Sequence, residues 1–222
     1  MSFTIAIPSR RFENLLPCVA AIRAAGETAR ILVIDDGLSQ RADGCEYLQG
    51  ITPFIYSRAI NQAIAAAGTD DILALNDDCL LKTPGGFTLL AQAAEEHPEF
   101  GVISAVMTNV GNRNQFPHRT GGLRVEPRMV TYTAVYLPRA TFEKVGPLDE
   151  RFGGVDEQGR LRWGYDDDDH CFRIRRAGLK IGIHDGCLVD HGTLKSTARG
   201  HGHVSLDPGR DVFIKKWGVY PL

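Results

Sequence analysis

The sequence predicts an α/β fold with a mainly parallel central sheet and helices on both of its faces. Two observations predict this fold. Short apolar runs alternate with amphipathic segments along the first part of the chain, a pattern typical of β–α–β units. The runs at residues 3–7, 31–34 and 71–75 are continuously apolar. Strands with no polar alternation are expected to be covered on both faces, as in parallel sheets.

The remaining elements follow from apolar spacing and from residues that end helices. Helices are expected at residues 14–25, 59–67 and 86–96, with Gly26 and Gly68 ending the first two. Further strands are expected at 101–106, 130–137 and 180–184, separated by a loop-rich region at 108–128 and a glycine-rich loop at 152–164. Helices at 165–177 and 211–217 complete the prediction.

Composition excludes several function classes. The chain has 222 residues and a formal net charge of -2, so its overall charge indicates neither a nucleic-acid nor a membrane partner. It has no apolar run long enough to span a bilayer and no signal-like start, so we expect a cytoplasmic protein. Five cysteines without a CxxC pair argue against a disulfide framework or a zinc knuckle.

Polar residues follow each of the first three predicted strands. In an open parallel sheet the strand ends meet at one edge, where ligands bind. The sequence therefore predicts a site at this edge. The residues concerned are Pro8-Ser9-Arg10, Asp35-Asp36-Gly37 and Asn76-Asp77-Asp78.

Two pairs of aspartates at this edge have more than one interpretation. Asp77 and Asp78 repel each other unless a cation offsets their charge, and Mg²⁺ or Mn²⁺ suits such carboxylates. An isolated pair of this kind is more often a solvated turn. Asp35 and Asp36 either form a turn with Gly37 or accept hydrogen bonds from a base or a ribose.

Four consecutive aspartates, Asp166 to Asp169, open the helix predicted at 165–177. Helix N-termini favour acids, which explains one or two of them. Four in a row repel one another, and on a helix Asp167 projects about 100° away from Asp166. Crowding by like charges raises the proton affinity of a carboxylate toward the value that a general base needs. We therefore expect at least one of the four to act in catalysis.

Histidines offer a weaker signal. His191, in LVDHGT, is either structural or a metal ligand. His201 and His203 form a second group in a glycine-rich tail, but no HExxH or CxxC motif supports a zinc site.

Several motifs, in this order, resemble those of glycosyltransferase family 2, a group of GT-A enzymes, and in style its rhamnosyltransferase-like members. The likeness covers nearly the whole chain. The matching segments are Ile7–Arg10, Val33–Ser39, Ser57–Ala63, Asn76–Asp78, Gly146–Phe152, Trp163–Gly178, His191 and Lys216–Gly218.

The resemblance implies a GT-A fold and an inverting, metal-dependent transfer of a sugar from a nucleotide-sugar donor. It implies one domain, with a donor-binding half at about 1–106 and an acceptor-side half with a basic tail at about 107–222. Mn²⁺ or Mg²⁺ would be held by Asp78 and His191, and Asp167 would be the base. The donor side would comprise Pro8, Ser9, Arg10, Asp35, Asp36, Arg58, Asn61, Asn76 and Asp77, and the acceptor side Trp163, Tyr165 and Asp169.

Two departures from the family pattern matter. Asn76 replaces an aspartate in the DxD-type motif, which favours a metal contact through one carboxylate. Asp166 replaces the glutamate of the family's ED pair, so the base is either Asp166 or Asp167.

The acceptor and the reaction class stay open. A glycan, a lipid carrier, a small molecule or a modified nucleic acid are all possible acceptors, and the segments that would select one are 108–128 and 194–210. A sugar-nucleotide pyrophosphorylase is an alternative, but SRRFEN lacks the glycine-rich loop that it needs. A metal-dependent hydrolase lacks suitable ligand spacing. A non-catalytic module that binds nucleotide sugars or glycans is the third alternative.

Overall fold

In the described part of the chain, nine strands form one sheet in the order β3-β2-β1-β4-β8-β6-β9-β5, with β7 paired to β9 beside this path. The computed structural model describes residues 2–110, 112–118, 121–194 and 205–221. The strands are β1 (Phe3–Ser9), β2 (Arg30–Asp35), β3 (Glu46–Gln49), β4 (Asp71–Leu75), β5 (Cys79–Leu81), β6 (Phe100–Met107), β7 (Leu123–Glu126), β8 (Ala134–Leu137) and β9 (Lys180–His191).

The strand directions differ between the two halves of the sheet. β1, β2, β3 and β4 are all parallel, and the sequence predicts this direction for β1, β2 and β4. β8 runs antiparallel to both β4 and β6, and β5 and β7 run antiparallel to β9, while β6 and β9 are parallel. The sheet is therefore parallel in its N-terminal half and mixed beyond β4.

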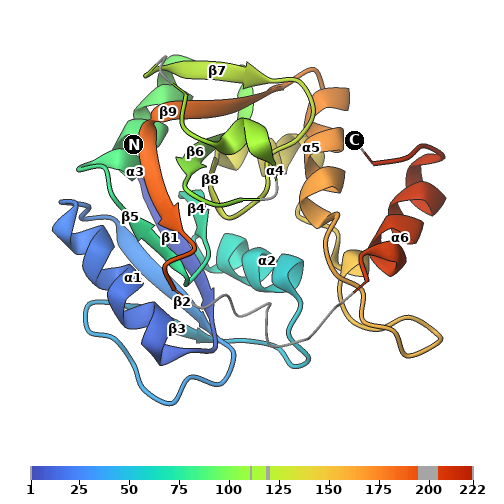
Figure 1. The fold of residues 1–222 in the computed structure, drawn as a ribbon, viewed down its shortest axis with the longest axis horizontal. Coiled ribbons are helices and arrows are strands. Elements are labelled where there is room, and N and C mark those ends of the chain that lie inside the picture. The colour runs from blue at the N-terminus through green and yellow to red at the C-terminus, as the bar shows by residue number, and fades with distance from the viewer. Residues whose placement is uncertain (1, 111, 119–120, 195–204, 222) are drawn as a thin grey trace.

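Helices cover both faces of the sheet (Figure 1). They are α1 (Phe12–Ala24), α2 (Tyr56–Ala66), α3 (Gly86–Glu96), α4 (Arg139–Val145), α5 (Asp166–Arg176) and α6 (Asp207–Trp217), with short 3-10 turns at Arg113–Gln115 and Glu150–Phe152. None of the helices in the described part of the chain is both long and apolar enough to cross a membrane.

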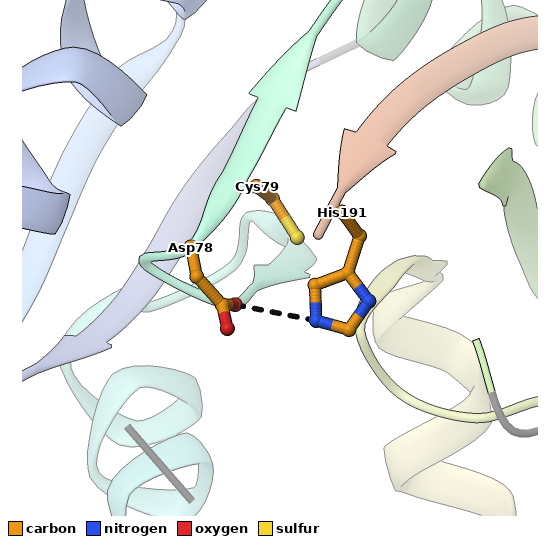
Figure 2. Close-up of side chains that lie close together, drawn as sticks. All are labelled: Asp78, Cys79 and His191. Atoms are coloured by element: carbon orange, nitrogen blue, oxygen red, sulfur yellow. Dashed lines mark ion pairs between the residues drawn. The ribbon is translucent and has the colours of Figure 1, made fainter. Parts of the chain in front are cut away.

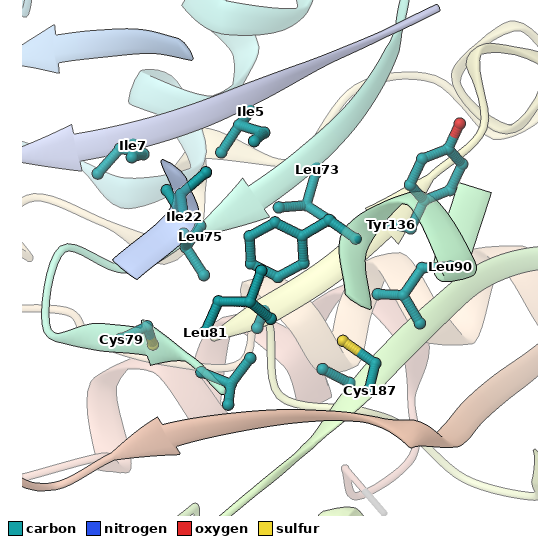
Figure 3. Close-up of a cluster of buried hydrophobic side chains, with 14 of the residues drawn as sticks. Ile5, Ile7, Ile22, Leu73, Leu75, Cys79, Leu81, Leu90, Tyr136 and Cys187 are labelled. Atoms are coloured by element: carbon teal, nitrogen blue, oxygen red, sulfur yellow. The ribbon is translucent and has the colours of Figure 1, made fainter. Parts of the chain in front are cut away.

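Two hydrophobic clusters lie on opposite faces. In β1, Ile5 and Ile7 join α1 and α3 in one cluster, part of which Figure 3 shows. Ala6, between them, joins α2, α4 and α5 in the other. Because successive side chains of a strand point to opposite faces, a strand buried on both sides is apolar at every position. This is the physical origin of the continuous apolar runs in the sequence.

The structure corrects the strand predicted at 130–137. Residues 131–133 form a turn, in which Thr133 N donates to Thr131 O at 2.9 Å, and β8 begins only at Ala134. The backbone of Thr131 bonds to the side chain of Gln115 in place of a neighbouring strand. β-Branched and aromatic residues favour strands, but here side-chain contacts override that preference.

Other elements were not expected from the sequence or differ in length. β3, β5, β7 and α4 are short and were not predicted; β7 lies within the region expected to be loop-rich. β9 continues to His191, past its expected end at His184. An irregularity in its pairing with β6, between Ala105 and Val106, allows the strand to continue. As a result His191 lies on a sheet strand and not in a loop.

Candidate active site

The two aspartates that follow β4 lie in the turn between β4 and β5, and their side chains have different partners. Asp77 is buried and accepts a hydrogen bond from the Ser9 hydroxyl at 2.7 Å. Asn14 on α1 donates to its second carboxylate oxygen at 3.5 Å. Asp77 thus connects β4 to the end of β1 and the start of α1, whereas Asp78 faces β9.

Strand pairing places Asp78 beside His191. Cys79, the first residue of β5, lies directly opposite His191 in the antiparallel pair with β9. Asp78 Oδ1 is 3.4 Å from His191 Nε2 (Figure 2). The other ring nitrogen, Nδ1, is 2.5 Å from Asn109 O, so it carries the proton and donates to that carbonyl. In the neutral ring, Nε2 then presents its lone pair toward Asp78.

These donors fit a hard divalent cation. Ligand atoms of Asp78, Cys79 and His191 lie within 4.8 Å of one another. A carboxylate oxygen and an imidazole lone pair that face each other need a proton or a cation between them. Burial raises the pKa of Cys79 well above its usual range, and its thiol lies 3.7 Å from Thr133 O. Cys79 therefore stays protonated, and the oxygen and nitrogen donors that remain suit Mn²⁺ or Mg²⁺.

A cavity of about 720 Å³ lies next to this pair and is lined by His191. Three residues expected on the donor side, Arg10, Asp36 and Asn76, line it, together with Trp163, Asp166 and Asp167. Asp36 Oδ2 is buried and accepts no hydrogen bond from the described residues; Arg10 Nε lies 3.4 Å away. Burial raises the pKa of Asp36. The cavity thus contains a carboxylate oxygen that a ligand N–H or O–H group would satisfy.

Four other residues expected on the donor side do not line this cavity. Pro8 and Ser9 are buried within β1, and the Ser9 hydroxyl bonds to Asp77. Asp35 Oδ1 accepts hydrogen bonds from the N–H groups of Gly37 at 3.0 Å and Leu38 at 2.8 Å, closing the turn after β2. These contacts place Pro8, Ser9, Asp35 and Asp77 in the sheet edge, and none of the four lines the cavity.

Arg58 and Asn61 on α2 also lie outside the cavity lining. Arg58 Nε forms an ion pair with Glu150 Oε2 at 2.8 Å. Asn61 donates to Leu148 O and accepts from Leu148 N, each at 2.9 Å. Both side chains therefore hold the 148–150 turn against α2, and neither lines the cavity.

An unusual backbone turn presents the start of α5 to the cavity. Gly164 and Tyr165 both have positive φ angles, 78° and 68°. Tyr165 is the only described non-glycine residue in this region of conformational space, which side chains with a Cβ rarely adopt. Such strain is retained where the surrounding structure enforces it, often at functional sites. Here it directs Asp166 and Asp167, the first residues of the helix, toward the cavity.

A second cavity of about 760 Å³ lies on the other side of Asp167. Tyr165 and Asp168 line only this second cavity, whereas Asp166 lines only the first. Asp167 lines both. The remaining lining comes mainly from residues 112–114 and 126–129. Asp167 is thus the carboxylate at the junction of the two cavities.

The first three aspartates of α5 are hard to ionise. Burial, followed by the charge of Asp167, raises the pKa of Asp166 to about 7 and that of Asp168 to about 8. Burial also raises the pKa of Asp167, but hydrogen bonds from the backbone N–H groups of Asp168 and Tyr132 oppose the rise. The backbone N–H of Asp168 donates to Asp167 Oδ1 at 3.0 Å.

Asp169, expected on the acceptor side, has a structural role. It is fully buried, and its Oδ1 accepts hydrogen bonds from Trp217 Nε1 at 2.8 Å and Lys216 Nζ at 2.6 Å. Its Oδ2 pairs with Arg173 Nε at 3.0 Å. Asp169 therefore anchors α6 to α5. Of the basic tail, Lys195, Arg199, His201 and His203 lie outside the described residues.

Several lining residues were missed by the sequence analysis. They are Gln49 at the end of β3, Tyr56 and Ser57 at the start of α2, the 131–133 turn, and Leu206 before α6. Tyr132 is hidden in a run that favours a strand, and Gln49 lies on a strand too short to predict. No pattern in the sequence signals these positions.

The fold is that of solved glycosyltransferases. The crystal structure of GalNAc-T7 with UDP, GalNAc and Mn²⁺ matches with a TM-score of 0.68 and 11% identity, over 86% of this chain and 44% of that chain. S. aureus TarS 1–349 matches with a TM-score of 0.58 and 13% identity, over 86% of this chain and 60% of that chain. The fold is GT-A. This chain spans less than two thirds of either neighbour's length. No family model and no curated protein matches the sequence.

Proposed function

We propose that this GT-A protein is an inverting, metal-dependent glycosyltransferase. It would bind a nucleoside-diphosphate sugar in the first cavity and transfer the sugar to an acceptor hydroxyl in the second. The position of Asp167 carries the proposal. A carboxylate shared by two cavities, with a cation site at the edge of one of them, is what a transfer between two bound substrates requires.

The nucleotide part of the donor would bind at the sheet edge where β1, β2 and β4 end. Asp36 and Arg10 would contact the nucleoside, and Asp78 and His191 would hold Mn²⁺ or Mg²⁺ beside the diphosphate. When bound, the cation supplies a Lewis acid that offsets the charge of the departing nucleoside diphosphate. The solved GalNAc-T7 structure contains UDP and Mn²⁺, which supports a nucleotide ligand and a cation in this fold.

The reacting hydroxyl would lose its proton to Asp167. A carboxylate within hydrogen-bond reach of the acceptor contributes roughly 10²- to 10⁴-fold as a general base. Direct attack by that hydroxyl, from the side opposite the departing diphosphate, would invert the anomeric carbon. Asp166 lines the donor cavity alone, which favours Asp167 as the base.

The segment 152–164 would exclude water from the donor. Val155 and Leu161 form an isolated bridge that closes this segment into a narrow loop. A Cβ on Gly153 would lie 2.2 Å from Ile55 Cγ2, so the loop backbone packs closely against the start of α2. Gly153, Gly154 and Trp163 line the cavity. Excluding water favours transfer over hydrolysis of the donor.

Calorimetry with a panel of nucleoside diphosphates, with Mn²⁺ and then with a chelator, tests the donor site. We expect one diphosphate class to bind only with the metal. Asp78→Asn should lose the metal-dependent binding of the diphosphate, because one of the two protein donors to the metal is weakened. Asp43→Asn, the same change at an exposed position, is the control.

Turnover of the sugar nucleotide separates the alternatives. Transfer with an inverted anomeric centre supports the proposal. Binding without turnover would indicate a non-catalytic module, and release of pyrophosphate from a nucleoside triphosphate would indicate a pyrophosphorylase. Absence of binding by every diphosphate near 1 mM, a typical weak-ligand range, would overturn the donor site.

A further inference from the structure

Tyr132 is held by two hydrogen bonds next to Asp167, the candidate base. Its carbonyl accepts a hydrogen bond from the Tyr56 hydroxyl at 2.5 Å. Its own hydroxyl lies 2.7 Å from His170 Nδ1. It lines the same cavity as Asp167, and its backbone N–H lowers the pKa of that carboxylate. The residue thus connects α2, α5 and the cavity wall.

His170 is buried on α5, three residues after Asp167, and takes no part in lining either cavity. Its ring stacks on Phe142 with centroids 5.8 Å apart and meets Tyr132 edge-on at 5.7 Å. Nε2 lies 3.3 Å from Gly146 O. Burial and the positive charge of Arg173 lower its pKa to about 3, so the ring is neutral. The neutral ring donates from Nε2 to Gly146 and accepts at Nδ1 from Tyr132.

The turn that contains Tyr132 has little sheet pairing of its own. Residues 131–133 precede β8, and the side chain of Gln115 bonds to both the N–H and the carbonyl of Thr131. The carbonyl of Thr133 accepts from Asn76 N at 2.9 Å. The middle of the turn therefore depends on Tyr56 and His170. Tyr132 is also buried in the hydrophobic cluster that includes α2, α4 and α5, so these hydrogen bonds set its orientation within a packed environment.

We propose that His170 is a positioning residue for this site. By binding the hydroxyl of Tyr132 it holds the 131–133 turn against Asp167 and fixes that carboxylate at the junction of the two cavities. The proposal rests on the function proposed above, in which Asp167 is the base. Its distinct content is that a buried histidine outside both cavities sets the direction and proton affinity of that base.

The direction of the expected change in the pKa of Asp167 follows from the effect of the Tyr132 N–H on that carboxylate. A backbone N–H that donates to a carboxylate stabilises the ionised form and lowers its pKa. Loosening Tyr132 should therefore raise the pKa of Asp167 and leave less of the base ionised at neutral pH. The other titratable groups that face Asp167 are Asp166, Asp168, Tyr56, Tyr132, Tyr165 and Cys171.

The test uses Tyr132→Phe, His170→Phe and the double variant. His170→Phe keeps an aromatic ring against Phe142 but loses both hydrogen bonds. Carboxyl ¹³C NMR titration would follow Asp167, whose signal is the one absent in Asp167→Asn. We expect the pKa of Asp167 to rise by about 1 unit in each single variant, the share of one backbone hydrogen bond. The kcat at neutral pH should fall about 10-fold.

Further measurements distinguish positioning from stability alone. KM for the donor should stay unchanged, and the acid limb of the pH–kcat profile should move to higher pH. The double variant should be no worse than His170→Phe, because that variant already removes the one contact that Tyr132→Phe removes. His170→Gln, which offers a donor and an acceptor, should restore part of the activity. Tyr136→Phe, which removes another buried tyrosine hydroxyl bonded to Asp71 at 2.6 Å, is the control.

Two results would overturn the proposal. One is a lower melting temperature in Tyr132→Phe and His170→Phe with the pKa of Asp167 and kcat unchanged. The other is the same pKa rise in the Tyr136→Phe control. If His170→Phe does not fold, Tyr132→Phe decides alone. A rise in the pKa of Asp167 in a protein that transfers no sugar would support the positioning and contradict the proposed function.

Discussion

At the scale of single residues, neighbours on α5 differ in what surrounds them. Asp167 lines both cavities, Asp166 lines the donor cavity only, and Asp169 is fully buried in ion pairs. We expect Asp167→Asn to reduce kcat by roughly 10² to 10⁴, the contribution of a general base, with donor affinity nearly unchanged. Asp166→Asn should cost much less. Turnover assays and donor calorimetry on both variants check this, and the reverse order would make Asp166 the base.

The three aspartates also make folding depend on pH. The pKa of Asp168 rises to about 8, from burial and the charge of Asp167, so the folded state binds a proton that the unfolded chain releases near pH 4. The contribution of Asp168 to the free energy of unfolding is therefore fully present below pH 4 and is lost as the pH rises through about 8. Asp168→Asn carries no charge at any pH and should melt higher than the wild type at pH 8.5, but not at pH 4.

Thermal melts of Asp168→Asn across this range check the prediction. Asp43→Asn, at an exposed position, should show no difference that depends on pH. An equal gain at pH 4 and pH 8.5 would show that the replacement acts through packing and not through charge.

Residue roles were only partly predictable from the sequence. Apolar runs placed the aspartates after the strands; Asn76 and Asp167 line the first cavity, and Asp78 lies beside His191. Asp77 and Asp78 are adjacent in one turn and face opposite sides, which spacing alone does not reveal. Likewise Arg58 and Asn61 lie on α2, but their partners on the 148–150 turn come from far along the chain.

At the scale of elements, α6 fixes the strained turn before α5. Phe213 packs against Phe172, with ring centroids 5.8 Å apart, and Lys216 forms ion pairs with Asp149 and Asp169. At the other end of α6, Gly209 lies against the backbone of residues 163 and 164. The helix thus supports the turn that presents Asp166 and Asp167.

Gly209→Ala tests this support. An added Cβ would lie 2.7 Å from Trp163 O and 2.9 Å from Gly164 O, and backbone oxygens do not move easily. Alanine gains about 1 kcal/mol of helix propensity, but overpacking costs about 1–3 kcal/mol, so a net loss of stability is expected. Turnover should fall with it, because the turn shifts. Denaturant unfolding and turnover assays measure both effects.

Gly122→Ala is the matched control, since a Cβ there has no atom within 4 Å. Gly209→Ala with full stability and full activity would show that α6 does not support the turn.

The elements missed by the sequence analysis share a physical cause. β5 has three residues and β3 and β7 have four each, too few for a periodic pattern. Residues 131–133 favour a strand by composition, but Gln115, Tyr56 and His170 hold them as a turn. Long, continuously buried elements were predictable because burial alone dictates their sequence, whereas short ones depend on partners distant in the chain.

At the scale of the whole molecule, the site joins the two halves of the sheet. The parallel half supplies Arg10, Asp36 and Asn76 from the ends of β1, β2 and β4. The mixed half supplies His191 from β9, and α5 supplies Asp167. β4 and β8, paired antiparallel, connect the halves, so ordering of the site depends on the central strands.

Amide hydrogen exchange should reflect this arrangement. β1 and β4 lie inside the sheet, paired on both sides, and their apolar residues belong to both hydrophobic clusters. β3 lies at one edge and its side chains are partly exposed. Because central elements open only with global unfolding and edges open locally, amides of β3 should exchange on the order of 100-fold faster than those of β1. Mass-spectrometric exchange measures this ratio, and equal protection in β1 and β3 would mean that the parallel half opens as one unit.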